Sequence, residues 1–91
     1  MKERYIEQRI TEEAKKLNFL TYKFVSPSRK GVPDRIFITP KGRIFFIEFK
    51  TEKGKLTKLQ EKTIVAFMNY KIDVSVVRNI EQGLEILKLN A

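Results

Sequence analysis

Cysteine and histidine are both absent from the 91-residue sequence, and no apolar run reaches the length of a membrane span. Without cysteine there is no disulfide framework and no thiolate metal site, and without histidine there is no imidazole base and no typical zinc site. The first residues, MKERYIEQRI, are charged, which is not the pattern of a membrane segment. Any chemistry must therefore use carboxylates, lysines and amides, and we expect a soluble cytoplasmic protein with no membrane partner.

Basic side chains outnumber acidic ones by 19 to 11, which gives a formal net charge of +8. Such a charge favours a polyanionic partner, foremost nucleic acid and then an anionic membrane surface, because binding releases counterions from phosphates. The basic residues are spread along the chain and are concentrated locally at Arg29, Lys30, Lys50, Lys53, Lys55 and Lys58. The alternative is that these lysines form only a solvated surface.

The length favours one domain, residues 1–91, built around a single core. Ile6, Ile10, Ala14 and Leu17 recur at helical spacing and predict an amphipathic helix over residues 3–17. Periodicity and turn residues predict strands over 19–25, 35–39, 43–50 and 73–77, and helices over 57–69 and 79–89. The order α-β-β-β-α-β-α predicts an α+β or mixed α/β fold, a mixed sheet with helices packed on it.

The turn PKG, residues 40–42, predicts the register of a hairpin, because proline suits a type I turn and glycine the left-handed residue that follows it. Such a turn pairs Thr39 with Arg43. Counting outward, Asp34 then faces Glu48 on the same side of the sheet, with Cβ atoms roughly 5 Å apart. Like charges placed directly opposite destabilise a sheet unless something cationic lies between them. The two carboxylates are therefore interpreted as the halves of a cation site.

Lys50 is expected to project from the same face as Glu48. Two carboxylates suit a hard ion such as magnesium, and the backbone carbonyl of Phe49 is a candidate third ligand. A divalent ion lowers the pKa of its bound water and neutralises charge on a phosphoryl oxygen, while Lys50 would hold or activate the water or stabilise the pentavalent phosphorus. The alternative is a purely structural ionic cluster, which would leave two acids against one lysine.

GVPD, then thirteen residues, then EFK and TEKGKLTKLQ resemble the PD-(D/E)XK nuclease superfamily, and within it the virus-type replication-repair nuclease (VRR-NUC) domains. The resemblance runs from Glu7 to the last strand. It implies a PD-(D/E)XK nuclease-like fold and cleavage of DNA phosphodiesters with Mg²⁺ or Mn²⁺. It further implies that Asp34 and Glu48 are metal ligands and that Lys50 is the catalytic lysine, the same three residues that the hairpin count brings together.

Members of this family also carry a glutamate on the first helix, and we assign that role to Glu7 in preference to Glu3. Glu7 follows Ile6 and lies three residues before Ile10, at the margin of the apolar stripe, from which it can lean toward the sheet. The alternative is an ordinary solvated glutamate near a helix N-terminus.

Gln60 resembles the glutamine that follows the EXK motif in the family, where it would position a phosphate or a water. Its role stays open, because Thr57 to Gln60 also fits a helix capping box and one residue is not expected to serve both fully. Tyr22 and the phenylalanines of FFIEF are expected in the core and not as base-stacking platforms.

Lys23 matches a basic position of viral family members and would contact the scissile phosphate or the backbone, although an outward-facing strand lysine is the alternative. Contacts with DNA phosphates are also expected from Arg29, Lys30, Arg35, Lys53, Lys55 and Lys58.

The sequence thus indicates a small Mg²⁺- or Mn²⁺-dependent DNA endonuclease. No recognition helix or zinc module is evident, so structure-selective or nonspecific cutting is favoured over sequence-specific cutting. The resemblance implies a homodimer acting on branched DNA such as four-way (Holliday) junctions, since a twofold dimer supplies two related cuts. It also suits a phage or bacterial origin and the host-cell cytoplasm. The alternatives are a nucleic-acid-binding module without catalysis and a structural or partner-binding protein.

Overall fold

Seven elements follow one another in the computed structural model, which describes residues 1–91. They are α1 (Glu3–Lys16), β1 (Leu20–Lys23), β2 (Arg35–Ile38), β3 (Ile44–Phe49), α2 (Lys58–Asn69), β4 (Asp73–Val77) and α3 (Ile80–Asn90). The predicted order and the α+β fold class are confirmed, and the element ends differ from prediction by about two residues at most, as is usual at frayed ends. None of the three helices is long and apolar enough to cross a membrane.

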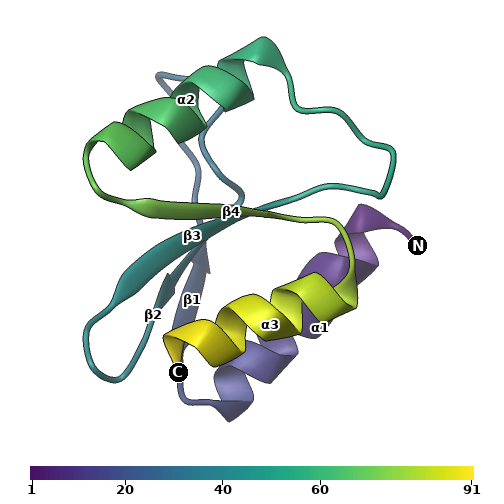
Figure 1. Ribbon diagram of the computed structural model, residues 1–91, viewed down its shortest axis with the longest axis vertical. Coiled ribbons are helices and arrows are strands. Elements are labelled where there is room, and N and C mark those ends of the chain that lie inside the picture. Colours follow the sequence, from purple (N-terminus) through teal and green to yellow (C-terminus); the bar gives the residue numbers. More distant parts are fainter.

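The four strands form one mixed sheet in the order β1-β2-β3-β4. The first three strands are antiparallel to one another, and β4 runs parallel to β3. Figure 1 shows α2 alone over one face of the sheet, while α1 and α3 lie side by side against the other. Helix α2 is thus the crossover that a parallel pair of strands requires.

The hydrophobic core lies between the sheet and the pair α1 and α3. Alternation along β3 sends every second side chain to this face, and residues from both helices meet them. The core residues are Ile6, Ile10, Ala14, Phe19, Phe37, Phe45, Ile47, Phe49, Val77 and Leu87. Helices α1 and α3 approach closely at Gly83, where an added Cβ would lie 2.4 Å from the side chain of Ile10.

The opposite face of the sheet is covered less completely. The ring of Phe46 lies 5.1 Å from that of Phe24 and 5.2 Å from that of Phe67, and α2 has no fully buried residue. The phenylalanines of FFIEF are buried as predicted, but the prediction that Tyr22 lies in the core is wrong, because its side chain is 57% exposed. Tyr22 belongs to the edge strand β1, and α2 packs over β4 at the far side of the sheet.

The predicted hairpin register is confirmed. The N–H of Thr39 donates to the carbonyl of Arg43 at 2.9 Å, and Gly42 has a φ of +85°, the left-handed conformation that the turn requires. In the ladder Ile36 is paired with Phe46. One more step of two residues toward the strand ends brings Asp34 opposite Glu48.

Candidate active site

Asp34 immediately precedes β2, where the chain leaves the loop at the buried Pro33. Its Oδ2 accepts the backbone N–H of Phe49 at 2.8 Å, and its carbonyl accepts the N–H of Phe24 at 2.9 Å. The side chain is therefore held by the backbone of β3 itself, beside Glu48.

Glu48 is the only charged residue among the buried ones, with 2% of its surface exposed. Its Oε2 accepts a hydrogen bond from Nε2 of Gln60 at 2.9 Å and lies 4.0 Å from Nζ of Lys50. The carboxylate thus faces α2, as the strand alternation predicts, with the lysine beside it. Asp34, Glu48 and Lys50 form one cluster where β2 starts and β3 ends.

The cluster contains two carboxylates and only one ammonium group, so its negative charge is not fully balanced. Burial, and then the charge of Asp34, raise the pKa of Glu48 to about 7 against the lowering effect of Lys50. Burial also raises the pKa of Asp34, more than the hydrogen bond from Phe49 lowers it, and the charge of Glu7 adds to the rise. Burial therefore disfavours the ionised form of both carboxylates, and a bound cation would favour it.

The donor set fits a hard divalent cation. Oδ1 of Asp34 accepts no hydrogen bond within the protein, and no buried side-chain oxygen lacks a partner, so this oxygen reaches solvent. Glu48 accepts from Gln60 through Oε2, and the backbone N–H of Asp34 also lowers its pKa. No cluster of three acidic side chains exists, which leaves these two carboxylates and backbone oxygens as the available ligands. A cation that keeps several waters needs no more than that. The carbonyl of Phe49 as a third ligand stays a prediction.

Gln60 caps helix α2 and also contacts the acidic cluster. Its Oε1 accepts the N–H of Thr57 at 2.9 Å and its N–H donates to the hydroxyl of Thr57 at 3.1 Å, which completes a capping box at the start of α2. Its Nε2 meanwhile donates to Glu48. The amide can do both because it carries its acceptor and its donors on separate atoms, and its role in positioning a phosphate or a water stays a prediction.

Glu7 of α1 is held in a network of ions. Its Oε2 accepts from Nζ of Lys23 at 2.7 Å and from Nε of Arg35 at 2.8 Å. Burial raises the pKa of Glu7, but the hydrogen bonds and charges of these two cations outweigh burial and lower it below its ordinary value. Glu7 is close enough to raise the pKa of Asp34 by its charge, and Glu3 acts on Glu48 in the same way. Both candidate acids of the first helix therefore lie near the cluster.

The seven basic residues expected at DNA are not equivalent. Arg35 is 18% exposed in its side chain, and its guanidinium donates to Glu7 and to the hydroxyl of Thr21. Lys23 contacts the same glutamate but remains 60% exposed. The other five are exposed: Arg29, Lys30, Lys53, Lys55 and Lys58.

Arg78, which the sequence did not single out, anchors the loop that follows Lys50. Its Nη1 donates to the carbonyls of Thr51, at 2.9 Å, and Gly54. The backbone N–H of Lys50 itself donates to the carbonyl of Val77, at the end of β4. An arginine directly after a strand carries no recognisable signal for this role, because its partners are carbonyls more than twenty residues away.

Comparisons with known proteins agree with the resemblance. A family model described as the VRR-NUC domain matches residues 1–79. The chain is 43% identical over 60 residues to "Putative nuclease p44" of Acyrthosiphon pisum secondary endosymbiont phage 1, a match that covers 66% of this chain and only 64% of that protein. It also resembles a solved structure described as a VRR_NUC domain, with a TM-score of 0.88, 28% identity and 94% of both chains covered.

Proposed function

The chain belongs to the VRR-NUC domain family, and on that premise we propose that it is a divalent-metal-dependent, structure-selective DNA endonuclease. One observation carries the proposal: Asp34 and Glu48 face each other across two strands with Lys50 beside them, and both carboxylates have raised pKa values. A purely structural cluster has no reason to leave Glu48 buried and short of positive charge.

In this proposal the two carboxylates and the carbonyl of Phe49 would hold Mg²⁺ or Mn²⁺. The bound ion would supply a water of lowered pKa and neutralise charge on a phosphoryl oxygen. The ammonium of Lys50 holds the attacking water or stabilises the charge that develops on the phosphorus oxygens. Gln60 fixes the orientation of Glu48 through its hydrogen bond.

Glu7 is the acid that α1 brings to the site. Because its pKa is lowered, Glu7 is ionised at neutral pH and holds the exposed Lys23 near Asp34, where the lysine meets a DNA phosphate. Arg35 supports this network by binding Glu7, and it is not assigned a phosphate because its guanidinium is largely covered. Contacts with the remaining DNA backbone come from Arg29, Lys30, Lys53, Lys55 and Lys58.

The proposed substrate is branched DNA such as a Holliday junction, cut by a homodimer. A chain whose longest extent is 33 Å covers little of a junction, and two copies related by a twofold axis supply the two cuts that a symmetric junction needs. The similarity to a phage protein supports a role in the cytoplasm of a host cell. Sedimentation of the protein alone and with a junction tests the dimer.

Cleavage assays test the proposal. Labelled four-way junction, flap, duplex and single strand are incubated with Mg²⁺, Mn²⁺ or EDTA, and the products are resolved. We expect metal-dependent cuts in the branched substrates, none in EDTA, and none with Asp34→Asn or Glu48→Gln, whose DNA binding is retained. Glu85→Gln, on the exposed side of α3, is the matched control and cleaves normally. Activity retained in either site variant would refute the assignment, and binding without cleavage under all conditions would leave a nucleic-acid-binding module.

A further inference from the structure

A groove of about 590 Å³ lies between the loop of residues 26–33 and α2, outside the catalytic cluster. Its cationic lining comes from Arg29 and Lys30 on the loop and from Lys62 on the helix. Val32, Leu59 and Phe67 are among the apolar residues that line it.

The loop contacts α2 at a glycine, a residue that has no side chain. Gly31 has a φ of +94°, and a Cβ there would lie 2.9 Å from the backbone of Leu59. On one wall of the groove, Val32 lies two residues before Asp34 in the sequence. The other wall includes Leu59, which directly precedes Gln60. A chain lying in the groove therefore arrives next to the catalytic cluster.

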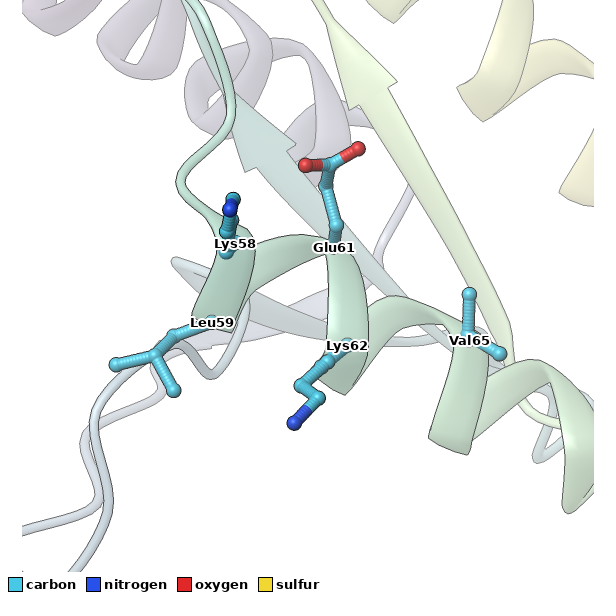
Figure 2. Close-up of a pocket in the computed structure, with 5 residues that line it drawn as sticks. All are labelled: Lys58, Leu59, Glu61, Lys62 and Val65. Carbon is cyan, nitrogen blue, oxygen red and sulfur yellow. The ribbon is translucent and has the colours of Figure 1, made fainter.

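The charge of the groove limits what it accepts. Three cations and no carboxylate line it. Figure 2 shows why: Leu59 and Lys62 point to one side of α2, while the carboxylate of Glu61 points to the opposite side. The occupant must carry negative charge together with an apolar surface. A second copy of this chain does not complement the groove, because its net charge is +8.

We propose that this groove binds an unpaired strand of the DNA substrate, with phosphates at Arg29, Lys30 and Lys62 and base faces against Leu59 and Val32. Proteins that hold single strands combine a positively charged groove with aromatic side chains on which bases stack, and here the aromatic Phe67 lies beside Leu59 and Val32. The volume is that of a site for a small molecule, which fits one or two nucleotides and not a duplex. The inference rests on the proposed function and adds that the substrate has an unpaired segment beside the scissile phosphate.

Binding in EDTA tests the groove independently of cleavage. Fluorescence anisotropy compares a blunt duplex with the same duplex carrying a single-stranded tail. We expect the wild type to bind the tailed duplex about tenfold more tightly, the effect of one base contact. Ala66→Glu places a carboxylate in the groove at an exposed helical position, and it should abolish this preference while the affinity for blunt duplex changes by less than about twofold.

Two matched variants complete the test. Ala66→Gln has nearly the same shape without the charge and should keep most of the preference, whereas Lys62→Gln should lower it. Lys88→Gln on α3 should leave it unchanged. The inference is overturned if the wild type shows no preference for the tail, if Ala66→Glu weakens both DNAs equally, or if Ala66→Glu changes the oligomeric state. If the protein prefers the tailed duplex but cuts no substrate, the groove proposal stands and only the nuclease proposal is refuted.

Discussion

Replacing Glu48 by glutamine should stabilise the metal-free protein at neutral and alkaline pH. The carboxylate is buried, and its pKa is raised from the ordinary value of 4.5 to about 7. The folded state therefore binds this proton more tightly than the unfolded state does. Stability from this group is fully present below about pH 4.5, is lost as the pH rises, and is gone above about pH 7.

The size of the effect follows from the shift. Each unit of pKa corresponds to about 1.4 kcal/mol, so a rise from 4.5 to about 7 destabilises the ionised folded protein by about 3 kcal/mol. Glutamine has nearly the same shape, carries no charge, and still offers an oxygen to Nε2 of Gln60. Asp34 also has a raised pKa, so a weaker pH dependence of the same sign should persist in the variant.

Urea unfolding in EDTA between about pH 5 and pH 8 measures this difference, with the m-value checking that the unfolded state is unchanged. The curves of wild type and Glu48→Gln should diverge as the pH rises, with the variant more stable at the upper end. Glu85→Gln, which removes an exposed carboxylate from α3, should run parallel to the wild type. Parallel curves for Glu48→Gln, or an equal divergence for Glu85→Gln, would refute the reasoning.

Three further predictions concern the site and its frame. Millimolar Mn²⁺ should raise the melting temperature of the wild type but not of Glu48→Gln, and an equal rise in both would place the ion elsewhere. Gly83→Ala should cost about 1–3 kcal/mol in urea unfolding, because its Cβ would meet Ile10 at 2.4 Å, and an unchanged midpoint would contradict that packing. Arg78→Gln should speed proteolysis within residues 51–55 and lower the cleavage rate about tenfold at unchanged circular dichroism; unaltered proteolysis would show that the loop does not depend on Arg78.

Local rules were enough to predict the geometry of the hairpin and which of its side chains lie together. The turn PKG allows one register, and that register decides which residue of β2 faces which residue of β3. The pairing of Asp34 with Glu48 follows from counting, and so does the side on which Lys50 lies. These relations involve residues close in sequence and a single hairpin.

Relations between distant elements were not predictable in the same way. The ion network of Glu7 depends on how α1 crosses β1 and β2, and no local pattern predicted the contact between Arg35 and Glu7. Tyr22 has the residue type and spacing of a core position, but it lies on the face of the sheet that α2 covers, and α2 packs over β4 and not over the edge strand β1. The hydrogen bonds of Arg78 depend on the path of a loop that lies more than twenty residues away in the sequence.

Gln60, in the first turn of α2, is hydrogen-bonded to the carboxylate of Glu48, and no residue of that helix is fully buried. Packing therefore fixes α2 weakly, and Gln60 ties its first turn directly to the ionisation state of Glu48. A change in the charge of that carboxylate acts directly on its hydrogen bond with Gln60, in the same helix that carries Lys62. If the proposed cation alters the affinity for a strand lying along α2, then by thermodynamic reciprocity that strand alters the affinity of the carboxylates for the cation by the same factor. Binding of the strand and readiness to cut would then be linked through this one helix.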